Sequence, residues 1–375
     1  MLRRACHLLA LLAFASGAGS AQTTINPDIS VIPRFLIVTN DGEHLAEGKR
    51  TFSQPDFQFE ELEMVIAAYL NPFARADVVL TLPGPDIEAG ALGIEELYAS
   101  VLRGLPLNLN IRLGKYRVDF GKLNMMHPHQ WPFITQPLSQ ERFFGESLND
   151  LGISVSALLP TGDVYSKLTL DVLRGTPIGE ATGIEDTTGA KPTYATAGRL
   201  MGFFPVGEYA DLETGISFYT GIHDPYYRER FWYWNFDFKY KYKPDMYTSL
   251  TLQGEFLLNR RTALQDRAFQ PFVDENGNPA PRRITSSGAY LYADYQFMKT
   301  YSIGARFDWS QSPYSTDDHA RALSLFLGYY PVEETLGVRL QYQNTRTEHA
   351  GSAQSVNLIA LQVMFSLGPH KAHPF

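Results

Sequence analysis

Four histidines lie in two closely spaced pairs, and imidazole nitrogens are common ligands of transition metals. The pairs are His127-X-His129 and His370-X-X-His373. Neither pair has a carboxylate partner at a fixed ligand spacing, so we interpret all four as structural loop histidines, with zinc or copper binding as the alternative. The sequence lacks the nucleophile-elbow, zinc-protease and phosphate-loop motifs. We therefore predict no catalytic residue, no cofactor and no enzymatic activity.

Charged residues recur at every second position in several segments, which places them on one face of an extended chain. Acids and bases interspersed around a channel create a transverse field that orients polar solutes, whereas a ring of one sign selects by charge. The alternative is that these charges only form salt bridges along a wall. The main predicted lining residues are Glu96, Arg112, Asp237, Lys239, Lys241, Arg306, Asp308 and Arg339. The same parity adds Glu63, Asp77, Lys167, Asp171, Glu213, Glu255 and Asp294.

The elements that carry these charges are predicted to be β-strands. In FWYWNFDFKYKYK, residues 231–243, aromatic side chains occupy one parity and mostly charged ones the other. A helix would spread both classes around its circumference, whereas a strand separates them onto two faces. Segments 107–113, 289–297, 301–310 and 336–343 repeat the alternation.

The connections between these strands alternate strictly between short and long. Short turns are predicted at 71–73, 104–106, 160–162, 206–210, 244–245, 298–300 and 331–334, and longer loops at 39–56, 83–91, 118–147, 174–194, 223–230, 259–286, 312–318 and 347–353. Together they join about sixteen strands, and this asymmetry is typical of an all-β transmembrane antiparallel up-and-down barrel with short periplasmic turns and long outer loops. A soluble β-sandwich is the alternative. Aromatic residues at strand ends, such as Tyr69, Tyr116 and Tyr329, are expected in interfacial girdles.

The first residues have the pattern of a secretory signal peptide. A basic start, Arg3-Arg4, precedes an apolar run and small residues that end at Ala21, so residues 1–21 are predicted to be removed and residues 22–375 to form one barrel domain. The single cysteine, Cys6, belongs to this segment. A net charge of −8 disfavours nucleic acid as a partner.

The longest predicted loop, residues 118–147, is the third outer loop in this strand count. We expect it to fold into the barrel as a constriction, with Trp131, Phe133, Phe143 and Phe144 against the wall. Its polar candidates are Asp119, Lys122, His127, His129, Glu141 and Arg142.

The exported chain with its alternating strands resembles bacterial outer-membrane porins, loosely the group that includes the phosphate-selective porins. The segment from Gly121 to His129, the following Gln130-Trp131-Pro132-Phe133, and the tail from Gly368 to Phe375 resemble parts of uncharacterised porin-like proteins. A concentrated ladder of basic residues is missing, so phosphate selectivity is not part of the expectation.

We therefore predict a porin of a Gram-negative-type outer membrane, in contact with lipid bilayer and lipopolysaccharide and expected as a homotrimer, that passes small hydrophilic solutes or ions by diffusion. The first alternative is a plugged barrel with a binding or scaffold role, for example in metal handling. The second is an outer-membrane enzyme.

Overall fold

The computed structural model describes residues 27–42, 52–84, 92–175, 194–224, 229–263, 272–278, 280–332, 335–349 and 351–368. The predicted signal peptide, His370 and His373 lie outside these residues. Among the residues described, no helix has the length and apolar character needed to cross a membrane.

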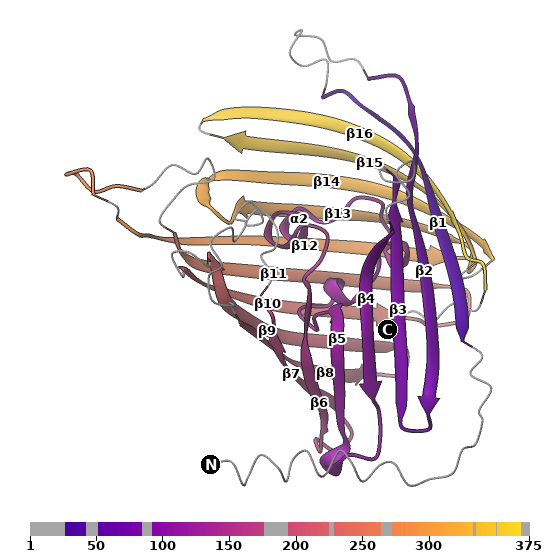
Figure 1. Ribbon diagram of the computed structural model, residues 1–375. Helices are drawn as coiled ribbons and strands as arrows, with labels where there is room; N and C mark the ends of the chain where they lie inside the picture. The colour runs from indigo at the N-terminus through magenta and orange to yellow at the C-terminus, as the bar shows by residue number, and fades with distance from the viewer. Residues whose placement is uncertain are drawn as a thin grey trace, which may run out of the picture.

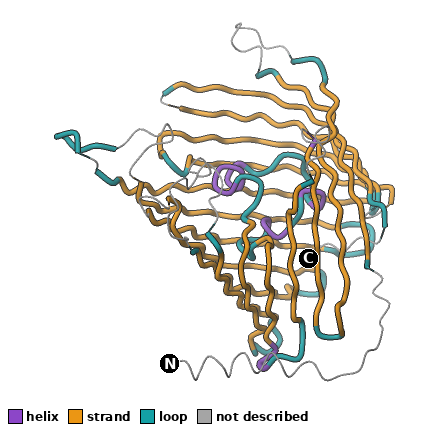
Figure 2. The backbone as a smooth tube through the Cα atoms, viewed as in Figure 1, coloured by secondary structure: helices purple, strands orange, loops and turns teal. Residues whose placement is uncertain are grey.

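Sixteen antiparallel strands form one closed barrel, as the sequence predicted (Figure 1, Figure 2). Each strand pairs with its neighbours in the chain, and β1 closes the sheet against β16, for example through Phe35 opposite Val363. The strands are β1 (Asp28–Asn40), β2 (Asp56–Asn71), β3 (Ala74–Pro83), β4 (Gly93–Val101), β5 (Leu109–Arg117), β6 (Asn149–Leu159), β7 (Tyr165–Leu173), β8 (Ala195–Val206), β9 (Ala210–Asp224), β10 (Glu229–Tyr242), β11 (Ser249–Ala263), β12 (Arg282–Phe297), β13 (Tyr301–Ser312), β14 (Ser315–Val332), β15 (Leu336–His349) and β16 (Ser352–Phe365). Because strands follow chain order around a closed barrel, each strand lies across the lumen from the one eight places away.

In the part of the chain that the structure describes, the helical elements are few and short. They are the 3₁₀ turns η3 (Pro106–Asn108), η4 (Leu123–Met125) and η5 (Pro128–Gln130) and the helix α2 (Leu138–Phe144). Three of them lie in the connection between β5 and β6, which Figure 1 shows against the inner side of the wall. The end of the barrel from which this connection leaves is here called the loop end, and the opposite end, where β2 and β3 are joined, is called the turn end. The longer loops predicted at 312–318 and 347–353 are wrong, because β14 begins at Ser315 soon after β13 ends at Ser312, and β16 begins at Ser352 soon after β15 ends at His349.

Strand β10 shows how the pattern of side chains produces a membrane barrel. Trp232, Trp234 and Phe236 are exposed on the outer face, while Asn235 and Asp237 between them are buried on the lumen face. An apolar outer face and a polar inner face are the reverse of a soluble barrel and fit a surface surrounded by lipid. Tyr69 and Tyr329 are exposed, as girdle residues require, whereas the prediction is wrong for Tyr116, which is fully buried and donates to Asp171 Oδ1 at 2.9 Å.

Replacing a lipid-facing aromatic residue with a charge is expected to destabilise the barrel according to depth. Phe236 lies near the middle of β10 and is 51% exposed, so Phe236→Arg should lower the free energy of unfolding by about 2–4 kcal/mol. Tyr242→Arg at the end of the same strand should lower it by about 0–1 kcal/mol. Urea unfolding in lipid vesicles measures both, and equal losses would contradict a lipid-facing band on β10.

Candidate functional site

The connection between β5 and β6, residues 118–148, is called the lumen loop below. Its two ends meet at the wall, where the Val118 amide donates to the Leu148 carbonyl at 3.0 Å. The Asn124 side chain donates to the carbonyls of Val118 and Leu148 at 2.8 and 2.9 Å and accepts from the Leu148 amide at 2.7 Å. This neck lets the segment leave and rejoin the wall at one point.

Aromatic side chains give the lumen loop two apolar contacts with the wall. In the first, Phe120, Phe143 and Phe144 pack against inward-facing residues of β7 to β11, including Tyr219 and Tyr233. In the second, the members are Leu123, Met126, Trp131 and Phe133 of the loop with Tyr290, Tyr292 and Phe326 of the wall. Both groups are buried. The loop therefore shields from water the apolar side chains that face the otherwise polar lumen.

A chain of buried ion pairs fastens the start of the loop to β7–β10. Arg199 of β8 contacts Asp119 at 2.9 Å, Asp237 at 2.6 Å and Glu213 at 3.3 Å. Lys167 lies 2.8 Å from the other oxygen of Asp119. Burial alone would raise the pKa of Asp119, but Lys167 and Arg199 hold it well below its usual range, so this carboxylate stays charged.

The same wall also contacts the loop at Lys122 and Leu123. Lys122 lies 2.6 Å from Glu213, and the Leu123 amide donates to Glu255 at 2.6 Å. Gly121 between these contacts has φ +67°, and a Cβ there would come within 2.3 Å of Glu255 Oε2 and 2.5 Å of Asn235 Nδ2. Only glycine fits both the backbone conformation and this approach.

Further along, the loop reaches the opposite side of the barrel at β13–β15. Arg339 donates to the His129 carbonyl at 2.7 Å, and Arg306 donates to the Thr135 carbonyl at 2.6 Å. The Ile134 amide donates to Gln341 Oε1 at 2.6 Å. Arg306 also pairs with Asp308 at 2.8 Å and lies over the Phe133 ring.

The two histidines of the loop lie against β2 and β4. Nδ1 of His127 lies 3.3 Å from Glu63 and 3.5 Å from Glu95, and Nδ1 of His129 lies 3.1 Å from the same Glu63 oxygen. Burial disfavours the charged form of His127, but the carboxylates outweigh it and raise the pKa of His127 to about 10. The expectation that these histidines lack carboxylate partners is therefore wrong.

These contacts carry the loop across the whole lumen. It bonds to β2 and to β11, to β7 and to β15, and the members of each pair lie about opposite one another in the barrel. Level with it, the inward-facing side chains of the wall are buried, including Asn235, Glu255, Asp308, Ser324 and Gln341. In the residues described, the loop thus covers these wall residues of β10, β11, β13, β14 and β15.

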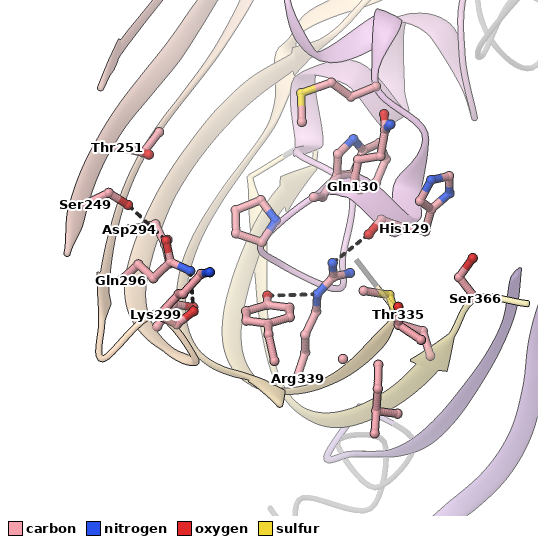
Figure 3. A pocket seen from close by; sticks show the side chains of 18 of the residues that line it. His129, Gln130, Ser249, Thr251, Asp294, Gln296, Lys299, Thr335, Arg339 and Ser366 are labelled. Atoms are coloured by element: carbon pink, nitrogen blue, oxygen red, sulfur yellow. Dashed lines mark hydrogen bonds between the residues drawn. The ribbon is translucent and has the colours of Figure 1, made fainter. Parts of the chain in front are cut away.

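A cavity of about 350 Å³ lies between the lumen loop and the turn end (Figure 3). His129, Gln130 and Trp131 of the loop form part of its lining, and Figure 3 shows Arg339 pointing toward the His129 carbonyl. Its charged lining residues are Lys239, Lys241, Lys299, Arg339 and Asp294. The cavity therefore has a strong excess of positive charge.

The residues predicted from the sequence are distributed over these groups. Asp119, Lys122 and Asp237 are in the Arg199 network, Arg306 and Asp308 form the β13 contact, His127, His129 and Glu96 meet at β2–β4, and Lys239, Lys241 and Arg339 line the cavity. Three candidates lie apart. Glu141 is exposed, Arg142 lies 3.5 Å from Asp318, and Arg112 stacks on Tyr98 and Tyr116.

Some contributors were missed by sequence reasoning. Arg199 shares its parity with Met201 and Phe203, which made its strand ambiguous. Arg117 donates to the Met126 carbonyl at 3.0 Å and pairs with Glu95. Parity singles out neither residue, because Arg117 is the last residue of β5 and Glu95 is followed directly by Glu96. The conformation of the loop, which selects these partners, leaves no period in the sequence.

A closed sixteen-stranded barrel with an apolar outer face and an inward-folded third loop is the architecture of a porin-like bacterial outer-membrane protein. No protein-family model matches the chain. A protein of Aquifex aeolicus (strain VF5), described as uncharacterized, is 28% identical over 347 residues that span 85% of this chain and 70% of that protein.

Three solved structures share the fold at low sequence identity. An anion-selective porin from Comamonas acidovorans has a TM-score of 0.60 at 10% identity, covering 92% of this chain and 100% of that chain. The outer membrane channel DcaP of Acinetobacter baumannii has a TM-score of 0.58 at 10% identity, covering 93% and 99%. In vitro folded OmpT of Vibrio cholerae in its trimer form has a TM-score of 0.53 at 9% identity, covering 92% and 99%.

Proposed function

We propose that the protein is a porin-like channel of the bacterial outer membrane that passes small hydrophilic solutes or ions, and that the lumen loop controls the passage. The observation that carries this proposal is the loop that bonds to opposite walls inside a sixteen-stranded barrel. A barrel of this size leaves an aqueous channel unless something folds inward. The conformation described here is then the closed one, and conduction requires the loop to move.

The second candidate is a plugged barrel with a binding or scaffold role. It is favoured by the depth to which the loop is buried, because Phe120, Phe133 and Phe143 are completely enclosed. Moving such a loop exposes apolar surface and breaks buried ion pairs, which is unfavourable. If the loop never moves, the lumen stays closed permanently.

Single-channel recording of the refolded protein in a planar bilayer separates the two functions. Brief or low-conductance openings of the wild-type protein are expected for a gated channel. Membranes that stay closed, although the same preparation is folded and heat-modifiable on gels, would overturn the channel function and leave the plugged barrel.

The basic cavity predicts a preference for anions. Four cationic side chains and one acidic side chain line it, and charges around a narrow passage set its ion selectivity. Lys241→Glu should shift the reversal potential in a salt gradient toward cations, whereas Lys243→Glu should leave it unchanged because Lys243 is exposed at the turn end outside the cavity. A wild-type protein that prefers cations would contradict this selectivity.

The remaining expectations complete the proposal. The turns face the periplasm, the long connections face the outside and contact lipopolysaccharide, residues 1–21 act as the signal peptide, and three copies assemble side by side. Trimer formation is supported by the trimer form of one similar barrel and is measured by mass photometry in detergent.

A further inference from the structure

The cluster of histidines and glutamates beside β2 and β4 has the spacing of a metal site. One ligand atom each from Glu63, Glu95 and His127 lie within 4.8 Å of one another. A tetrahedral metal with bonds of about 2.1 Å holds its ligand atoms roughly 3.4 Å apart. The distances of 3.3 and 3.5 Å from His127 Nδ1, and of 3.1 Å between His129 Nδ1 and Glu63, are close to that value.

Three polar atoms of the cluster are buried without a hydrogen bond. They are Glu63 Oε1, Glu95 Oε2 and His127 Nδ1. Glu63 is only 3% exposed, so bulk water has little access to its carboxylate. Buried polar atoms are nearly always bonded, and a group of unbonded ones at one place indicates a ligand such as an ion. Two of these atoms, His127 Nδ1 and Glu95 Oε2, form an ion pair at 3.5 Å, so the observation that is independent of the spacing is Glu63 Oε1, which is buried and accepts no hydrogen bond.

The charges around the cluster also favour a cation. When a metal ion replaces the proton on His127, carboxylates outnumber guanidinium groups by three in the surroundings of the site, which comprise Glu60, Glu61, Glu63, Glu95, Glu96, Arg34 and Arg117. A dication reduces that excess to one. Arg117 does not take the place of this cation, because its guanidinium group bonds to the other oxygen of Glu95 and to the Met126 carbonyl. Arg117 thereby fixes the orientation of the Glu95 carboxylate.

We propose that Glu63, Glu95 and His127 bind one divalent transition-metal ion of the zinc class. Nitrogen donors beside carboxylates favour Zn²⁺, Co²⁺ or Ni²⁺ over Mg²⁺ and Ca²⁺. Glu63 and Glu95 belong to the wall and both histidines to the lumen loop. The bound ion therefore joins loop to wall, and the site forms whether or not the barrel conducts.

The test is Zn²⁺ binding to chelator-treated, refolded protein in detergent, measured by competition with a chromophoric indicator. One equivalent of Zn²⁺ is expected to bind, with no competition from Mg²⁺ in excess. Glu63→Gln and His127→Gln should each weaken Zn²⁺ binding by more than about 100-fold. Loss of a residue that hydrogen-bonds to a metal ligand already weakens binding, and loss of the ligand itself weakens it more. Co²⁺ in the same site should give the visible absorption of a tetrahedral complex.

Two controls make the result specific. His319→Gln removes a histidine that lies 3.3 Å from Glu348 but belongs to no such group of three among the described residues, and it should leave the affinity unchanged. The double variant His370→Ala/His373→Ala removes the tail pair and should also have no effect. Wild-type protein without a stoichiometric Zn²⁺ site, or binding that survives both Glu63→Gln and His127→Gln, would overturn the proposal. Because binding is measured without a membrane current, its outcome is separate from that of the channel.

Discussion

Replacing residues 119–147 with an Asn-Gly turn is expected to raise the single-channel conductance roughly tenfold, because an unobstructed barrel of this size holds an aqueous channel. The design uses the neck of the loop, where the Val118 amide and the Leu148 carbonyl are already bonded at 3.0 Å. A two-residue Asn-Gly turn closes an antiparallel pair of this kind. The wall carboxylates that lose their partners, such as Glu213 and Glu255, are then hydrated.

A second shortened loop is the control for this experiment. Removing residues 273–278, an exposed part of the connection between β11 and β12, should leave the conductance unchanged. Both proteins are first checked for the heat-modifiable mobility of a folded barrel. A loop-deleted barrel that folds but conducts no better than the wild type would contradict the role of the lumen loop as the obstruction.

Arg199→Met is expected to lower the free energy of unfolding by about 3–5 kcal/mol, because removing one partner of a buried ion network leaves unpaired charge. Three carboxylates, Asp119, Glu213 and Asp237, meet this one guanidinium group. Asp119 belongs to the loop, so the same substitution should also increase the frequency of channel openings. Denaturant unfolding in micelles gives the first quantity and bilayer recording the second.

Arg346→Met is the matched control, because Arg346 pairs with Glu348 at 3.0 Å in an exposed position. Exposed pairs contribute about 0–1 kcal/mol, so its loss should be small. If Arg199→Met and Arg346→Met had equal effects on unfolding, the Arg199 network would not be the anchor of the loop.

The strands could be predicted from the sequence because each strand has one face toward lipid and the other toward the polar lumen. Trp234 and Phe236 meet lipid while Asn235 and Asp237 meet the polar lumen, and this contrast is written at every second position of β10. Most turns and long connections could be located for the same reason, since the alternation stops where a strand ends. The loops predicted at 312–318 and 347–353 were too long, because β14 and β16 begin with polar residues that do not alternate with apolar ones. Tyr116 shows the limit of the pattern. It is an aromatic residue next to a strand end, as expected of a girdle residue, but it faces the lumen beside the neck of the loop.

The partners inside the lumen could not be predicted, because they depend on the irregular path of one long loop. Pro128 correctly predicts an extended His127, with ψ 152°, but the 3₁₀ turn from Pro128 to Gln130 is what brings the two imidazole rings to 5.7 Å. Glu63 lies 66 positions from His129, and no spacing in the sequence connects them. Parity correctly placed Glu63 and Glu96 inward, yet it gave no sign that Glu95 also contacts His127.

The most direct test of a lumen crossed by its third loop is the reactivity of single cysteines with a charged, membrane-impermeant thiol reagent. Ser324→Cys lies level with the loop, where Ser324 is fully buried and donates to Gln343, and Thr251→Cys lines the cavity at the turn end. The reagent added at the turn end should label Thr251→Cys rapidly and Ser324→Cys at least about a hundredfold more slowly, because that site becomes accessible only when the loop opens. Equal labelling rates at the two positions would mean that the lumen is open past the loop and would contradict the closed conformation that we propose.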